Sequence, residues 1–404
     1  MKTLREAGKD RDDAGYATEV RTALRSSQRT IISESTLIAM LSDNSSLKVG
    51  VFTRSPRRYV DVVLAESYPH INWDVVIAYE DVEQCKPNGE GILRGMIALG
   101  LGNTDELPHV LLVGDIDVDI RAAYNAGCRA ILFQKGWPRS YQPAHWRSLS
   151  LMPDVMTANE GSLRKLSLDP RPGLPHLELL LDGGTQAPGP LRFDAIGKFF
   201  PNDRERHVIH TAGRYFALYD NLNDRRAWHK LSLSIQDNKD AASFPAQWVE
   251  TIRSFIASHY QLLTAMPVFG GSGPELIITA IPARPSRSHR LGILIAQLQA
   301  SYGVSPSVGR LSLKFEPNAL AYRPGVQSQS HDHLNQEQRF ANVRDHLYVV
   351  DPVAAQGKRF LVIDDVSTTG ATLLYAQKYL KGAGASSVDC FSLAQTISDP
   401  LRYQ

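Results

Sequence analysis

The sequence predicts an α/β protein built from two doubly wound parallel-sheet domains. Short apolar runs alternate with helical patterns in two separate stretches, and a segment rich in Pro, Gly and Asp lies between them. The 404 residues also exceed what one core usually holds. Hydrophobic residues make up 43% and charged residues 21% of the chain, which are ordinary globular values. Each half can therefore bury a core of its own.

Charge and cysteine content argue against several classes of protein. The net charge of +2 gives no global excess for a polyanion or a membrane surface, so a phosphate site must be local. Cys85, Cys128 and Cys390 form neither a CxxC pair nor an even set, which fits a reducing compartment. The charged N-terminus lacks the apolar stretch of a signal peptide, and no run of about 18 apolar residues occurs. We therefore expect a cytoplasmic protein without a membrane partner.

The composition also predicts where the domains divide. The first alternating stretch runs from LKVGVF to about Leu168, and DPRPGLP and DGGTQAPGP then punctuate the chain. The second stretch begins at ELIITAI and resumes with RFLVID, TLLYAQKYLKGAG and SVDCFSLA. We predict a first domain over 1–168, a linker over 169–205, and a second domain over 206–404, with a hood at 206–274 and a core at 275–404.

The sharpest signal in the sequence is FLVIDDVSTTGAT, residues 360–372. An apolar strand ends in Asp364 and Asp365, and hydroxyl residues with a glycine then open a helix. Amides at a helix N-terminus carry partial positive charge, so this loop suits a phosphate monoester. The residues predicted to surround the phosphate are Ser367, Thr368, Thr369, Gly370, Ala371 and Thr372. The alternative is that an acid or hydroxyl merely caps the helix, which would explain one or two of these residues.

This string resembles the signature with which type I phosphoribosyltransferases bind 5-phosphoribosyl 1-pyrophosphate (PRPP). The resemblance implies that family's fold, with Asp364 and Asp365 as catalytic residues that face the ribose and a Mg²⁺ ion carried by PRPP. Upstream, ITAIPARPSRSHRLG stands where the family has its pyrophosphate loop, and guanidinium groups suit that dianion. The residues so assigned to PRPP are Ala283, Arg284, Arg287 and Arg290. The alternative for each arginine is a solvated loop residue.

Two weaker segments look like the ComF-like branch of this family, which is named for a role in DNA uptake. They are QSQSHDHLNQEQRFANVRDHLYVV and the hood segment WHKLSLSIQDNKD. The chain lacks that branch's cysteine-rich zinc ribbon, so a role in DNA uptake and a nucleic-acid partner stay open. The resemblance implies an enzyme that displaces pyrophosphate from PRPP with a nitrogenous acceptor, which the sequence does not identify. The alternative is a regulatory module of the same fold that senses PRPP without chemistry.

Three short motifs follow one another in the first domain. VGVFTRSP ends a strand, CKPNGEG places a lysine before a helix, and LLVGDIDVDI ends a strand in two carboxylates four residues apart. The carboxylates suit Mg²⁺ at a strand terminus, and the lysine and threonine suit a phosphate. This looks like motifs two, three and four of the haloacid dehalogenase-like (HAD-like) phosphohydrolases over residues 35–168. The resemblance implies a remnant site at Thr53, Arg54, Lys86, Asp115 and Asp119, with Mg²⁺ on the last two. The alternative is a doubly wound domain with helix caps and solvated acids.

The first motif of that family is missing. It is an apolar strand ending in Asp-x-Asp, whose first carboxylate attacks the phosphoryl group. Before Thr53, Asp10, Asp12 and Asp13 lie in the polar stretch GKDRDDAGY with no apolar run ahead of them. Either the strand has been lost from the chain start or the domain is a non-catalytic partner, so we expect little or no phosphatase turnover. We also expect an open sheet edge, covered by a neighbouring chain, as in a homodimer, or by the N-terminal segment.

Overall fold

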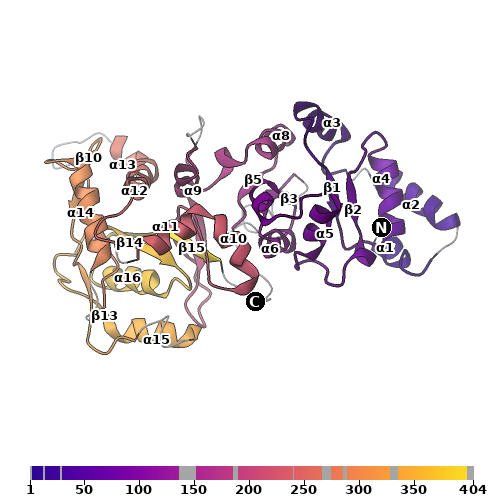
Figure 1. Cartoon of the computed structure of the whole chain (residues 1–404). Helices are drawn as coiled ribbons and strands as arrows, with labels where there is room; N and C mark the ends of the chain where they lie inside the picture. The colour runs from indigo at the N-terminus through magenta and orange to yellow at the C-terminus, as the bar shows by residue number, and fades with distance from the viewer. Residues whose placement is uncertain are drawn as a thin grey trace. The chain divides into compact units, whose positions relative to one another are not determined.

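The computed structural model of the chain describes residues 2–11, 14–27, 30–135, 152–184, 190–239, 241–265, 274–284, 289–327 and 335–397. These residues form two compact units, which are described separately (Figure 1). The first unit takes its described residues from Met1–Gly173 and Ala217–Trp228. The second consists of Leu174–Phe216 and His229–Ile397. The fold class is α/β with parallel sheets, as predicted; the phosphoribosyltransferase fold of the second unit stays a prediction.

The first unit alternates short parallel strands with helices. Its elements are α1 (Lys2–Ala7), α2 (Ala14–Ser27), α3 (Glu34–Asp43), β1 (Gly50–Phe52), α4 (Arg57–Ser67), β2 (Val75–Ile77), η1 (Tyr79–Asp81), α5 (Glu90–Ala98), η2 (Thr104–His109), β3 (Leu111–Gly114), α6 (Asp117–Ala126), β4 (Arg129–Phe133), β5 (Val155–Thr157), α8 (Glu160–Leu168), η3 (Arg171–Gly173), η4 (Asp220–Leu222) and α10 (Asn223–Trp228). α6 ends at Gly127, whose φ of 84° lies in the left-handed region that glycine adopts readily. The chain thereby turns from α6 directly into β4.

The strands of the first unit form two sheets rather than one. β1 pairs in parallel with β2, and β3, β4 and β5 form a separate parallel sheet with β4 in the middle. Four of the five residues of β4 are buried, whereas none in β1 or β3 is. Among the described residues, β1 and β3 each have one edge without a strand partner. The same holds for β2 and β5, the other outer strands, so an edge left open by a missing strand stays a prediction.

A segment from the middle of the chain completes the first unit. Within Ala217–Trp228, the Arg225 guanidinium is fully buried and forms an ion pair with Asp154, which is also fully buried. Arg225 Nη1 donates to the backbone oxygen of Cys128 at 3.0 Å, and its guanidinium carbon lies 3.9 Å from the centre of the Trp228 ring. Such a network anchors the segment in the core of this unit.

The second unit contains an eight-stranded sheet with helices around it. Its elements are α9 (His176–Leu181), β6 (Asp194–Lys198), β7 (His207–Thr211), β8 (Arg214–Phe216), α11 (Lys230–Asp237), α12 (Ala246–His259), α13 (Gln261–Ala265), β9 (Glu275–Ala280), α14 (Arg290–Tyr302), β10 (Ser307–Val308), β11 (Leu311–Phe315), β12 (Leu320–Tyr322), α15 (Gln336–His346), β13 (Leu347–Val349), β14 (Arg359–Ser367), α16 (Ala371–Gly382) and β15 (Ser387–Ile397). The sheet order is β10-β11-β9-β14-β15-β7-β6, and β8 also pairs with β15. β12 and β13 form a small antiparallel sheet.

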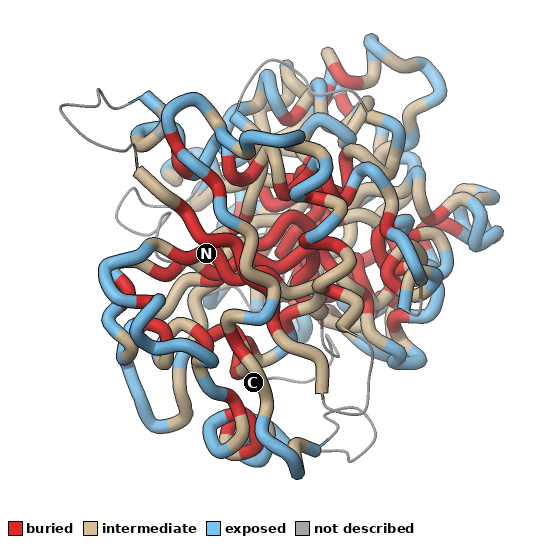
Figure 2. The backbone as a smooth tube through the Cα atoms, turned by 90° about the vertical axis from the view of Figure 1, so that its left-hand side faces the viewer, coloured by how far each residue is buried: buried red, intermediate tan, exposed pale blue. Residues whose placement is uncertain are grey.

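The central strands of the large sheet run parallel and are buried. β11, β9, β14, β15 and β7 are parallel neighbours, while β10 and β6 run antiparallel to theirs at the two edges. Five of the six residues of β9 are buried, which explains its unbroken apolar run. Figure 2, in which this unit faces the viewer, shows buried residues towards the middle of the unit and exposed residues towards its outside.

The strand order reverses between β9 and β14. From β9 the chain passes through α14 to β11 on one side, whereas from β14 it passes through α16 to β15 on the other. Leu373, Ala376 and Leu380 of α16 are buried, as their spacing predicted. In open α/β sheets, ligands bind outside the carboxyl ends of the strands at such a reversal.

The range 169–205, expected to be a linker, contains α9 and β6, and β6 pairs with β7. Among the described residues of this range, Pro172 and Gly173 lie in η3 and Gly183 has a φ of 69°, so they belong to turns beside short elements. β7 and β8, in the range expected to be a hood, are strands of the large sheet beside β15. The strand-like character of RYFALYD was expected, but the place of β7 and β8 in the large sheet was not, because it depends on pairing with β15, which is distant in sequence.

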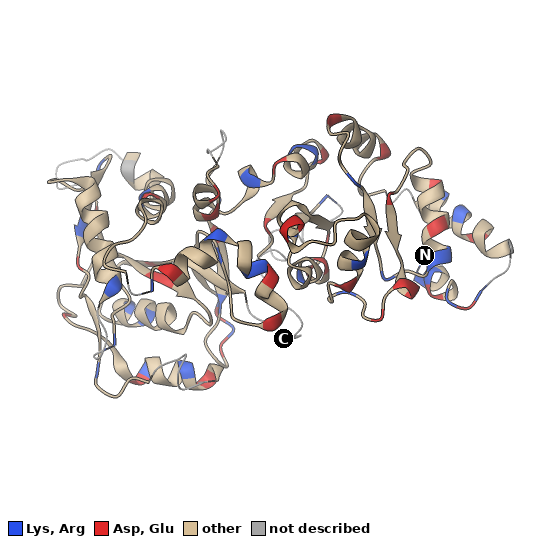
Figure 3. Cartoon of the chain, in the orientation of Figure 1, with Lys and Arg blue, Asp and Glu red and all other residues tan. Residues whose placement is uncertain are grey.

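Surface features agree with the small net charge. Acidic and basic residues are interspersed along both units in Figure 3. Within the described ranges, no helix is both long and apolar enough to cross a membrane. All three cysteines are free thiols, and Cys128 and Cys390 are buried.

Candidate functional site

A pocket of about 320 Å³ lies in the first unit where β1 and β3 end. It is lined by Arg5, Thr53, Arg54, Ser55, Lys86, Val113, Gly114, Asp115, Ile116, Val118 and Asp119. The structure therefore brings together all five residues that the sequence assigned to the remnant site. Their chemical roles stay predictions. Arg5, from α1, was not anticipated, because it stands alone in a polar helix without a motif.

The lysine and the second aspartate of this pocket hold each other in place. Lys86 Nζ donates to Asp119 Oδ1 at 2.8 Å, and the two side chains are only 13% and 10% exposed. Asp119 Oδ2 also accepts from the backbone amide of Asp115 at 3.2 Å, at the start of α6. A Cβ on Gly114 would stand 2.4 Å from Asp119 Oδ2, so only glycine fits there. Asp119 thus both caps α6 and forms an ion pair with the ammonium group of Lys86.

The two carboxylates of the pocket fit a divalent cation. Burial, and then the neighbouring charge of Asp119, raise the pKa of Asp115. A bound cation would relieve both effects, because it favours the ionised form of each acid. Asp115 and Asp119 would hold Mg²⁺, leaving Lys86 and Thr53 to face the anionic oxygens of a phosphate.

The second predicted site lies at the carboxyl ends of β9 and β14. The amide of Ile281 donates to the backbone oxygen of Ile363 at 2.9 Å, so the segment leaving β9 starts beside β14, next to Asp364. Arg284 follows β9, and Asp364 and Asp365 lie near the end of β14. The predicted acids and the described ends of the predicted pyrophosphate loop, at Arg284 and Arg290, therefore lie at the point where the strand order reverses.

Arg290 and burial determine the charge state of the two acids of this site. Asp365 forms an ion pair with Arg290, and its side chain is only 13% exposed. Burial raises the pKa of Asp364 to about 7, against the opposing charge of Arg290. Burial also raises the pKa of Tyr322 to about 12, although a hydrogen bond with Thr372 opposes the shift. Tyr322 was not anticipated, because β12 is only three residues long.

The 367–372 loop leads from β14 into α16. Gly370 immediately precedes the helix with a φ of 81°, and the hydroxyl oxygen of Thr369 accepts from the amide of Ala371 at 3.3 Å. Thr368 is exposed, while Thr369 and Thr372 are partly buried, so hydroxyl groups of the loop reach the surface. The amide of Ala371 is thus engaged by a side chain, while the amides that follow it in the first turn lack intrahelical partners and suit an anion.

Other predicted residues have different outcomes. Ala283 is partly buried next to Arg284, and Arg287 lies outside the described residues.

Lys198, at the end of β6, was not predicted from the sequence. Its ammonium group donates to the backbone oxygen of Thr368 at 2.8 Å. No motif could have found it, because β6 joins the site only through the pairing of distant strands.

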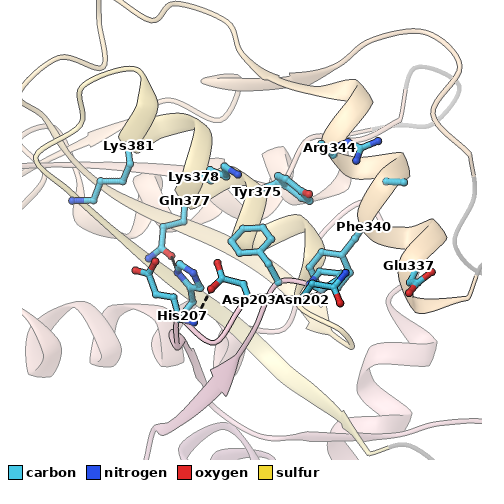
Figure 4. A pocket seen from close by; sticks show the side chains of 14 residues that line it. Asn202, Asp203, His207, Glu337, Phe340, Arg344, Tyr375, Gln377, Lys378 and Lys381 are labelled. Atoms are coloured by element: carbon cyan, nitrogen blue, oxygen red, sulfur yellow. Dashed lines mark hydrogen bonds between the residues drawn. The ribbon is translucent and has the colours of Figure 1, made fainter.

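A larger pocket of about 940 Å³ lies elsewhere in the second unit (Figure 4). It is lined by Phe200, Pro201, Asn202, Asp203, Glu205, His207, Glu337, Phe340, Ala341, Arg344, Tyr375, Gln377, Lys378 and Lys381. Ligand atoms of Asp203, Glu205 and His207 lie within 4.8 Å of one another, and His207 Nδ1 is 3.0 Å from Gln377 Oε1. None of the residues predicted from the sequence lines this pocket, so its size does not identify it as the predicted site.

Comparisons with known proteins concern the first unit. Residues 7–133 match the family of haloacid dehalogenase-like hydrolases. The chain is 34% identical over 132 residues to the phosphoglycolate phosphatases of Salmonella paratyphi A (strain ATCC 9150 / SARB42) and Salmonella typhi, covering 33% of this chain and 47% of each relative. It thus spans about half the length of these relatives. A solved haloacid dehalogenase-like hydrolase from Bacteroides fragilis is 24% identical with a TM-score of 0.26, covering 31% of this chain and 56% of that one.

Proposed function

We propose that this chain, whose residues 7–133 form a haloacid dehalogenase-like hydrolase domain, is a phosphoribosyltransferase that binds PRPP in its second unit. One observation carries the proposal: Asp364, Asp365 and Arg290 converge with the amino end of α16 at the reversal of strand order. A helix N-terminus suits the 5-phosphate, and paired carboxylates suit ribose hydroxyls or a divalent cation. PRPP carries the 5-phosphate, the ribose hydroxyls and a pyrophosphate that binds a divalent cation, so one molecule matches both features of the site.

Each group of the site has a distinct task in this reaction. A nitrogen nucleophile attacks C1 of PRPP, the bond from C1 to the pyrophosphate oxygen breaks, and pyrophosphate leaves with the electron pair. Arg284 and Arg290 stabilise the negative charge that develops on the leaving group. Asp364 and Asp365 orient the ribose and would hold Mg²⁺, which supplies a Lewis acid for the pyrophosphate. The 367–372 loop fixes the other end of the sugar by its phosphate.

Pyrophosphate release provides the direct test. The full chain should release pyrophosphate from PRPP and Mg²⁺ in the presence of at least one member of a panel of bases, amines and ammonia. The measurement is a coupled pyrophosphate assay, with the same chain lacking acceptor as the background. Binding of PRPP without release for any acceptor would favour a PRPP sensor. Failure to bind PRPP at all would remove the proposal.

A second proposal concerns the first unit, favoured by the family match and by the pocket that gathers Lys86, Thr53, Asp115 and Asp119. We infer that this pocket binds phosphate and Mg²⁺ but hydrolyses phosphomonoesters slowly. Asp119 is engaged by Lys86, and a cation would engage Asp115 as well. Among the described lining residues no further carboxylate remains to attack phosphorus.

Phosphate binding and hydrolysis should therefore separate in this pocket. We expect the chain with Mg²⁺ to hydrolyse p-nitrophenyl phosphate or phosphoglycolate no faster than buffer. Lys86→Met should weaken binding of inorganic phosphate by about tenfold, because it removes one charged hydrogen bond. Lys48→Met, at an exposed lysine of the same unit, is the matched control. Hydrolysis that Asp115→Asn abolishes would show instead that the pocket is an active phosphatase.

A further inference from the structure

Lys198 lies along the amino end of α16. It is the last residue of β6, in register with His207 of β7. Its Nζ donates to the backbone oxygen of Thr368 at 2.8 Å. A Cβ added to Gly370 would stand 3.1 Å from Lys198 Cγ, so the lysine stem packs directly against the residue that precedes the helix. A charged side chain from an edge strand therefore reaches the predicted phosphate loop.

The position of this lysine is electrostatically unfavourable without an anion. The amino end of a helix carries partial positive charge, and a cation beside it is destabilising. Lys198 is partly buried, and this burial lowers the pKa of its ammonium group to about 8. Among the described residues, the only partner of the ammonium group is a neutral carbonyl. The lysine charge and the positive end of α16 thus lie beside each other, and the described partner of the lysine does not neutralise it.

Polar atoms without partners lie in the same place. Ser367 is only 2% exposed, and its Oγ has no hydrogen-bond partner among the described residues. Gln395, in register with Ser367 on β15, donates through Nε2 to the Thr368 oxygen at 3.2 Å, while its Oε1 lacks a partner. Buried polar groups without partners are uncommon and call for a ligand or a water molecule. The loop is therefore incomplete in hydrogen bonding as well as in charge.

We propose that Lys198 binds the phosphate group held by the 367–372 loop. The inference rests on the proposed function and extends it to a residue outside the signature. An ammonium group has three donors, so one can remain on the Thr368 oxygen while another binds a phosphate oxygen. A phosphate dianion would offset both the lysine charge and the helix dipole. Because the loop amides are neutral, Lys198 supplies the full charge that distinguishes phosphorylated ribose from ribose.

Two ligands that each carry part of PRPP test the assignment. The full-length Lys198→Met chain should bind ribose 5-phosphate about 10- to 100-fold more weakly than the unaltered chain, as expected for the loss of a charged hydrogen bond. Its affinity for Mg²⁺ and pyrophosphate should not change, because that group binds beside Arg284 and Arg290. Lys198→Arg should retain part of the ribose 5-phosphate affinity. Lys378→Met, at an exposed lysine further along α16, is the matched control. Calorimetry measures each affinity.

The outcomes separate this inference from the function on which it rests. If the unaltered chain binds PRPP and Lys198→Met binds ribose 5-phosphate equally well, the lysine has no role in phosphate binding and only this inference fails. If the methionine variant loses both ligands equally and the arginine variant does the same, Lys198 is structural and the inference again fails. If the unaltered chain binds neither PRPP nor ribose 5-phosphate, the proposed function fails and takes the inference with it.

Discussion

Changing Asp364 and Asp365 together to asparagine should weaken Mg²⁺-dependent PRPP binding by at least about 100-fold. Each substitution removes a charged ligand of the sugar or the cation, and one such hydrogen bond is worth about 1.5–3 kcal/mol. It also leaves Arg290 without the carboxylate with which it pairs. Asparagine preserves the shape of the side chain, so the fold should persist. Calorimetric titration with PRPP and Mg²⁺ measures the loss.

The unaltered chain should also show a pH dependence that the asparagine variant lacks. Burial raises the pKa of Asp364 to about 7, so this acid is neutral below that pH and ionised above it. Cation binding needs the ionised form, and affinity for Mg²⁺ and PRPP should rise through about pH 7 and then level off. Asp345→Asn, at an exposed acid of α15, should bind PRPP normally. Unchanged affinity in the double variant would contradict the assignment of the acids.

Arg225→Met should destabilise the first unit by about 3–5 kcal/mol, because it leaves a buried carboxylate without its cation. Both members of the pair with Asp154 are fully buried. Asp154 Oδ2 also accepts from the amide of Ala130 at 2.7 Å, so the damage should reach β4 directly. Hydrogen–deuterium exchange resolved by peptide measures the effect in one unit at a time.

The result should be specific to the buried charge. Arg226→Met is the control, since Arg226 donates only to Ala217 O and Asn223 Oδ1 among the partners that the structure describes for it. Exchange should accelerate in β4 of the Arg225 variant, with little change in β14 or in the control. Replacing Asp154 by leucine as well should restore part of the stability, because no unpaired charge then remains buried. Normal protection of β4 in Arg225→Met would show that the ion pair adds little.

The parts of the fold that the sequence predicted are those encoded locally. The apolar runs of β9 and β14 and the face of α16 follow from residues a few positions apart. The loop from Asp364 to Thr372 is likewise one continuous string, so its place before a helix could be read directly. The five residues of the first pocket were found because three short motifs follow the ends of successive elements.

The parts that escaped prediction depend on distant pairings. Lys198 reaches Thr368 only because β6 and β7 extend the same sheet as β14. Tyr322 belongs to a strand too short to show alternation. Arg225 lies in the sequence NDRRAW, where nothing local distinguishes it from the exposed charges around it. In each case the deciding partner is remote in sequence, and a local pattern does not reveal such partners.

The insertion of Ala217–Trp228 into the first unit, between two stretches of the second, has a consequence for how the protein is made. Neither unit is a continuous piece of polypeptide, so a cut near Gly173 would not yield two self-sufficient halves. On the ribosome, the core of the first unit cannot be completed until Trp228 has left the exit tunnel. Its maturation is therefore tied to the synthesis of its neighbour, and chaperone dependence during translation should be greatest in that interval.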